Sequence, residues 1–81
     1  MAELHLPSTL APLFAGLHRT PPLKALGSGN VREAPGTMAP VAFAVESGDS
    51  LTGYSYVEDW VRISDEMGRG GWIFRKLIAR R

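Results

Sequence analysis

The sequence predicts an all-β fold, a small barrel or sandwich of short strands with a short N-terminal helix or arm. Nine Gly and six Pro in 81 residues favour many turns over long helices. Stretches rich in β-branched and aromatic residues recur about every ten residues, as in small barrels and sandwiches. One of them, 60–64, alternates strictly, with Val61 and Ile63 on the face opposite Trp60.

The expected strands follow one another along the chain, with turns between them. Residues 34–37 (Ala-Pro-Gly-Thr) predict a turn and residues 65–68 a hairpin loop. Residues 76–79 are expected to close the domain as one helical or 3₁₀ turn. The strands are a weak candidate at 23–33, which Gly27 and Gly29 interrupt, and then 41–45, 51–57, 60–64 and 69–74.

Residues 1–22 differ in composition from residues 23–81 and predict an N-terminal arm in front of the barrel. Four apolar residues fall at i, i+3, i+4 and i+7, which is one face of a helix. Pro21 and Pro22 would end it. A helix of about ten residues is marginal by itself, so this face is expected to pack on its own barrel, a second copy or a partner. The four residues are Leu10, Leu13, Phe14 and Leu17.

Composition restricts the classes of function. A chain of 81 residues allows one small domain and no cleft between two lobes. The lack of cysteine rules out disulfides and thiol nucleophiles, and two histidines do not supply a zinc site. No cofactor or metal is therefore expected. The net charge of +1 argues against nucleic acid as a partner.

Neither a membrane-spanning segment nor a signal peptide is evident in the sequence. Its longest apolar run, 41–45, is far shorter than the roughly 20 residues that a membrane span needs. The first residues, Met-Ala-Glu-Leu-His, lack the basic region of a signal peptide. As it stands, the chain is expected in the cytoplasm.

Five short landmarks occur in a characteristic order, at 29–37 (Gly-Asn-Val-Arg-Glu-Ala-Pro-Gly-Thr), Val41, 46–49, 59–63 and 70–73 (Gly-Gly-Trp-Ile). In this order and spacing the chain resembles the bacterial SH3 (SH3b) domain family over about residues 23–79. The resemblance implies an all-β, SH3-like barrel of five to six short strands that acts as a binding or targeting module without catalysis. It also implies a peptide, a peptidoglycan stem peptide or a protein as ligand. Proteins that carry domains of this family are often exported.

Aromatic side chains on the face opposite Val61 are the main candidates for a ligand groove. Rings with an apolar body and a polar tip suit peptide or sugar surfaces. Alternatively, the same rings cover one end of the barrel or seat the N-terminal helix. The candidates are Trp60, Trp72 and Phe74, with Tyr54 and Tyr56 expected beside them on one shared face.

Three charged residues complete the predicted site. The guanidinium of Arg32 suits a carboxylate, or else hydrogen-bonds to loop backbone. Glu58 and Asp59 are adjacent in a turn, which does not fit two catalytic carboxylates held across a scissile bond. They are expected at the edge of the groove, facing a cationic peptide. No residue pattern supports an enzyme.

A second hypothesis makes the chain a structural or assembly protein. Here the N-terminal helix face, rather than the aromatic groove, mediates self-association into a homo-oligomer or docking to a partner, because an apolar stripe this short needs a surface to cover it.

Overall fold

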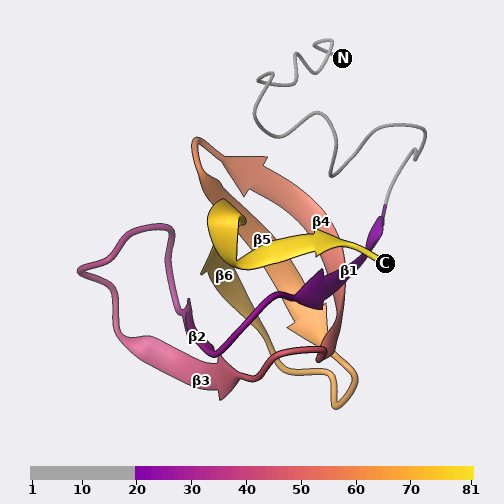
Figure 1. The fold of residues 1–81 in the computed structure, drawn as a ribbon. Coiled ribbons are helices and arrows are strands. Elements are labelled where there is room, and N and C mark those ends of the chain that lie inside the picture. Colours follow the sequence, from indigo (N-terminus) through magenta and orange to yellow (C-terminus); the bar gives the residue numbers. More distant parts are fainter. Residues whose placement is uncertain (1–19) are drawn as a thin grey trace, which may run out of the picture.

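A computed structural model describes residues 20–81, and within them the backbone forms seven strands and one 3₁₀ turn (Figure 1). The predicted all-β fold is confirmed. The predicted helix through Leu10, Leu13, Phe14 and Leu17 lies outside the described residues and stays a prediction. The elements are β1 (Pro22–Ala25), β2 (Gly29–Arg32), β3 (Val41–Val45), β4 (Ser50–Val57), β5 (Trp60–Asp65), β6 (Gly70–Phe74), η1 (Arg75–Leu77) and β7 (Ile78–Arg80).

Two regions differ from the prediction and bring the number of strands to seven. The weak strand at 23–33 is two strands, β1 and β2, because the chain bends between Ala25 and Gly29. The closing turn begins at Arg75 and gives way to β7, which pairs with β1. The Leu26 N–H donates to the Leu77 carbonyl at 2.8 Å, which joins the two regions. None of the described residues forms a helix long and apolar enough to cross a membrane.

All seven strands pair antiparallel in one sheet with the order β3-β2-β6-β5-β4-β1-β7, and Figure 1 shows this sheet curling round on itself. Strands β5 and β6 pair along their length, from Trp60↔Phe74 to Ser64↔Gly70. By contrast, β2 pairs with β6 at one position, Arg32↔Trp72. The sheet is therefore open between β2 and β6 beyond that pair.

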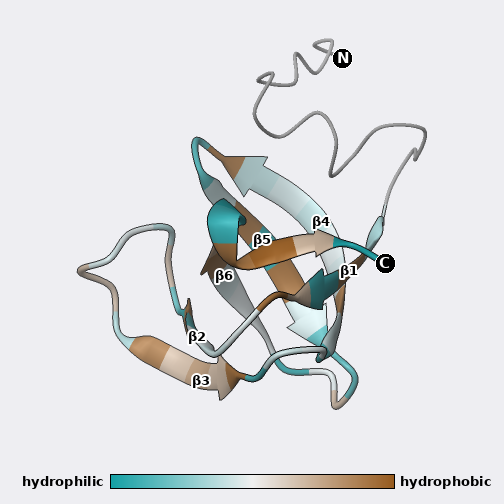
Figure 2. Cartoon of the chain, in the orientation of Figure 1, coloured by the Kyte–Doolittle hydropathy of each residue, from teal (hydrophilic) through white to brown (hydrophobic). Residues whose placement is uncertain are grey.

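The inner face of the sheet encloses one hydrophobic core. Figure 2 shows apolar and polar bands alternating along β5, and Val61 and Ile63 are at most 1% exposed. The predicted alternation at 60–64 is thus confirmed, and Val61 and Ile63 lie on the core side. Alternate residues of β5 and β6 must face away from the core. The buried hydrophobic residues are Leu23, Ala25, Val31, Val45, Leu51, Val61, Ile63, Ile73 and Ile78.

The small residue at Gly29 makes room for Leu77 of η1. A Cβ at position 29 would lie 2.8 Å from Leu77 Cδ1, closer than van der Waals contact permits. Leu77 is half-buried and packs against the core. Its side chain therefore takes the space that a larger residue on β2 would fill, and this packing fixes η1 beside β2.

One carboxylate holds the loop between β5 and β6. Asp65 Oδ1 accepts the N–H groups of Met67 at 3.0 Å and Arg69 at 2.8 Å, and Oδ2 accepts Arg69 Nε at 2.7 Å. Burial of this carboxylate by itself raises its pKa. The hydrogen bonds and the charge of Arg69 outweigh that effect and hold the pKa of Asp65 below its ordinary value.

We expect Asp65 to make the domain sensitive to acid. Because its pKa is lower in the folded chain than in the unfolded one, its contribution to stability is complete above about pH 4 and is lost as the pH falls through the folded value. Asp65→Asn should lower the free energy of unfolding at neutral pH by about 1–2 kcal/mol. The variant should also lose less stability than wild type as the pH falls. Thermal melts across pH check this, with Glu66→Gln as the neighbouring control. Equal acid sensitivity of wild type and Asp65→Asn would contradict the assignment.

Candidate functional site

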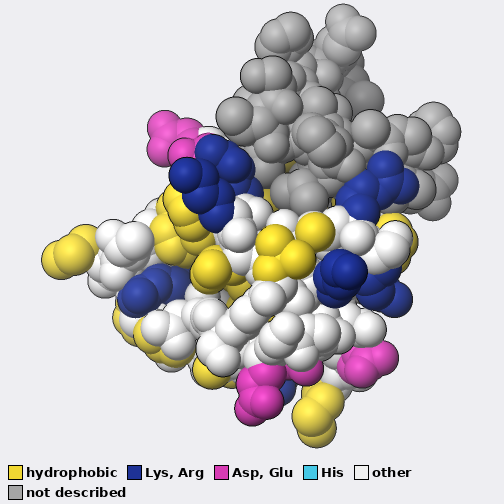
Figure 3. Space-filling model, viewed as in Figure 1, with side chains coloured by type: hydrophobic (Ala, Val, Ile, Leu, Met, Phe, Trp, Pro, Cys, Tyr) yellow, Lys and Arg dark blue, Asp and Glu magenta, His cyan; other side chains and the backbone are white. Residues whose placement is uncertain are grey.

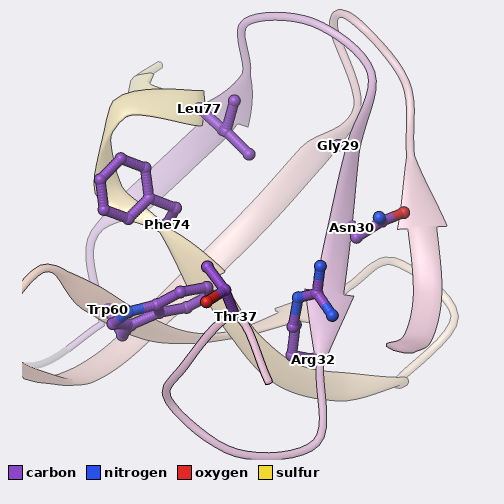
Figure 4. Close-up of a pocket in the computed structure, with 7 residues that line it drawn as sticks. All are labelled: Gly29, Asn30, Arg32, Thr37, Trp60, Phe74 and Leu77. Atoms are coloured by element: carbon purple, nitrogen blue, oxygen red, sulfur yellow. The ribbon is translucent and has the colours of Figure 1, made fainter. Parts of the chain in front are cut away.

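A hollow of about 300 Å³ lies where β2 and β6 separate. Continuing the register of Arg32↔Trp72 would place Asn30 opposite Phe74, but the pairing stops before them. The hollow occupies this opening in the sheet (Figure 4). We call it the groove, and its lining residues are Gly29, Asn30, Arg32, Thr37, Trp60, Phe74 and Leu77.

Trp60 and Phe74 form the apolar wall of the groove. They are opposite one another on β5 and β6, with ring centroids 5.6 Å apart and planes inclined by 60°. This edge-to-face arrangement is favourable because the positive edge of one ring meets the negative face of the other. Both rings are half-buried, so each keeps surface for a ligand. In Figure 4, Leu77 lies on the same side as Phe74.

Arg32 forms the polar wall together with Asn30, across the groove from Trp60 and Phe74 (Figure 4). Arg32 Nη1 donates to the Ala39 carbonyl at 2.9 Å. That bond tethers the loop between β2 and β3, from which Thr37 reaches the groove. A guanidinium has further N–H donors, so the bond to Ala39 leaves others for an anionic group in the groove. Arg32 thus makes the predicted loop contact and still faces the groove.

Charged residues flank the aromatic wall along the chain, since Asp59 precedes Trp60 and Arg75 follows Phe74. On the face shown in Figure 3, basic side chains border exposed hydrophobic ones, while acidic side chains lie towards the margins. The turn between β4 and β5 supplies the nearest carboxylate that the sequence singled out, Asp59. Asp59 Oδ1 accepts Arg75 Nε at 2.8 Å, and its backbone carbonyl accepts the Arg75 N–H at 2.8 Å.

The structure changes the expectation for Glu58 and Asp59. Asp59 is engaged by Arg75 at the start of η1, so it anchors η1 next to Phe74 rather than offering a free carboxylate. Glu58 is exposed in the same turn with a positive φ of 54°. Neither residue lines the groove, and their predicted contact with a cationic ligand has no support in this geometry.

The expectation that Tyr54 and Tyr56 share one face is wrong. The pairing of β4 with β5 shifts between Gly53 and Ser55, which marks a β-bulge. A bulge adds one residue to the strand and reverses the side-chain alternation after it. Tyr54 is therefore 44% exposed on the outer face, while Tyr56 packs against the core.

Of the eight residues predicted for the ligand site, Arg32, Trp60 and Phe74 come together in the groove. Trp72 is half-buried on the same outer face, beside Arg32 in the sheet. Asn30, Thr37 and Leu77 also line the groove, although the sequence pattern does not mark them as ligand contacts. Asn30 is adjacent to Val31 on β2, so strand alternation alone could have placed it on the outer face. Thr37 lies in the β2–β3 loop and Leu77 in η1, and alternation does not predict the direction of such residues.

A second, smaller hollow of about 170 Å³ lies at the loop between β5 and β6. Its carboxylate, Asp65, is already satisfied by Arg69. Across residues 20–81, moreover, no group of three or more His, Cys, Asp or Glu residues is placed to hold a metal ion. The groove between β2 and β6 is the better candidate site.

Comparison with known proteins supports the architecture. The family model described as bacterial SH3 domain matches residues 27–79. No curated protein matches the chain. Among solved structures, NlpC1 from Trichomonas vaginalis is similar to it, with a TM-score of 0.69 and 17% identity over 76% of this chain.

The likeness to NlpC1 concerns the fold alone, because only 17% of the aligned residues are identical. The matched region spans 22% of that longer chain. The family match is stronger evidence than this structural likeness, since it covers the strands that build the groove. Domains of this family are generally binding modules. The chain belongs to the bacterial SH3 domain family.

Proposed function

We propose that this domain binds short peptides in the groove. Arg32 would donate hydrogen bonds to a free carboxylate of the ligand, and Trp60 and Phe74 would contact an apolar side chain. The observation that carries the proposal is the presence of a guanidinium and an edge-to-face aromatic pair in one hollow of about 300 Å³.

The chemistry of the groove favours a carboxylate together with small apolar groups. Hydrogen bonds between a guanidinium and a carboxylate are charge-assisted, and the planar fork selects the planar anion. A hollow of this volume is at the small end of ligand sites, so it admits one or two residues of a peptide. Peptidoglycan stem peptides combine methyl side chains with a free carboxylate, and we propose them as the ligand class. The role is binding, with no chemical step.

An NMR titration tests this proposal. The probe is a stem pentapeptide, Ala-isoglutamine-Lys-Ala-Ala, with a free carboxyl terminus, and the matched control is the same peptide with a terminal amide. We expect saturable shifts of the Arg32 and Thr37 amides and the Trp60 indole N–H. The amide should bind about tenfold more weakly, because it lacks the negative charge to which Arg32 would donate its hydrogen bonds.

Two results would count against the proposal. One is the absence of any saturable shift with the free acid. The other is a set of shifts confined to residues away from the groove, such as those of β3.

A further inference from the structure

Arg32 is one end of a row of side chains that crosses the outer face of the sheet. It pairs with Trp72 of β6, which in turn pairs with Arg62 of β5. Trp72 and Arg62 alternate with the buried Ile73 and Val61, so both side chains face outward. Neighbouring strands are about 4.8 Å apart. The backbone positions of Arg32 and Arg62 are therefore about 10 Å apart, with the indole between them.

The far end of the row presents a second guanidinium. Arg62 is exposed, and its guanidinium carbon is 5.9 Å from the centre of the Tyr54 ring. The Tyr54 hydroxyl shares a 2.6 Å hydrogen bond with Ser64 Oγ, which holds the ring in place. In the part of the chain that the structure describes, the ion pairs join other side chains. Arg62 therefore presents its charge without a carboxylate beside it.

This row is continuous with the groove. Trp72 and Arg62 come two residues along their strands from Phe74 and Trp60, the aromatic wall. Two residues of a strand span about 6.7 Å. A peptide seated in the groove at Arg32 can thus extend across the indole of Trp72 to Arg62 without leaving the sheet face.

We infer that the groove and this row together select peptides with two carboxylates, one for each guanidinium. Arg32 binds one carboxylate, Arg62 binds the other, and the chain between them crosses Trp72. Charge complementarity carries the inference, since Asp59 of the nearby β4–β5 turn is already paired with Arg75 and Glu58 of the same turn does not line the groove. The inference rests on the proposed function and gives the ligand an acidic character rather than a cationic one.

Calorimetric titration of two matched peptides tests the inference. One is the stem pentapeptide with isoglutamine at its second position, and the other carries isoglutamate there, which adds a single carboxylate. We expect the isoglutamate peptide to bind wild type about fivefold more tightly at low salt. Arg62→Gln should remove this preference. Lys24→Gln, which deletes the same charge at an exposed position of β1, should keep it.

The outcomes separate this inference from the proposed function. If both peptides bind wild type equally, or if Arg62→Gln and Lys24→Gln behave alike, the two-carboxylate inference is wrong while groove binding stands. If neither peptide binds, the groove proposal fails and the inference fails with it. Short single-stranded DNA serves as a competitor. If that DNA binds more tightly than either peptide, and if Arg62→Gln abolishes this binding, the inferred ligand is a nucleic acid and the acidic-peptide inference is wrong.

Discussion

Gly71→Ala is expected to lower the free energy of unfolding by about 2 kcal/mol and the Tm by about 10 °C. A Cβ at position 71 would lie 2.6 Å from Val31 Cγ1 and 2.7 Å from the Arg32 carbonyl oxygen. Val31 is completely buried and the carbonyl belongs to the backbone, so neither can move unless β2 shifts. The substitution therefore strains the place where β2 meets β6.

Gly70→Ala is the matched control for this prediction. Its Cβ would lie 3.4 Å from the Ile63 carbonyl oxygen, which is close to ordinary contact, and Gly70 is exposed. The change should alter stability by less than about 0.5 kcal/mol. Thermal and urea unfolding of both variants measure the difference. Equal stability of the two would contradict the close approach of β2 to β6, and with it the shape of the groove.

Trp60→Ala should weaken binding of the stem peptide about 30-fold, which corresponds to about 2 kcal/mol. The indole is half of the aromatic pair on the apolar wall, and truncation to a methyl group removes most of that wall. The fold should persist, because Trp60 faces away from the core formed by Val61 and its neighbours. Calorimetry gives the affinity, and the emission of Trp72, the remaining indole, reports on folding.

Two further variants make the Trp60 result specific. Trp60→Phe keeps a ring on the wall and should lose less than about fivefold in affinity. Met38→Ala alters a side chain that is 95% exposed in the loop between β2 and β3 and does not line the groove, so it should bind like wild type. Unchanged binding by a folded Trp60→Ala variant would place the ligand elsewhere.

Much of the fold follows from period-two patterns in the sequence. The alternation at 60–64 correctly predicted that Val61 and Ile63 enter the core and that Trp60 faces outward. The same pattern placed Phe74 on the outer face with Trp60, and the two rings form one wall of the groove. Three ligand-site candidates therefore met in one groove, because side-chain direction in a regular strand depends only on position along it.

The misplaced residues belong to irregular backbone. Tyr54 and Tyr56 have the spacing of residues on one face, yet the bulge after Gly53 separates them. A glycine inside a strand often marks a bulge, and simple alternation does not take this into account. Thr37 and Leu77 reach the groove through a loop and a 3₁₀ turn, whose paths depend on tertiary contacts such as the bond from Arg32 to Ala39. Local propensity does not contain that information.

The most direct test of the groove as the ligand site is a set of intermolecular NOEs between the stem pentapeptide and the labelled domain. The peptide methyl groups should show NOEs to the ring protons of Trp60 and Phe74, with the terminal residue nearest Arg32. NOEs to Val41 or Ala44 on the edge strand β3, without any to Trp60 and Phe74, would contradict this account.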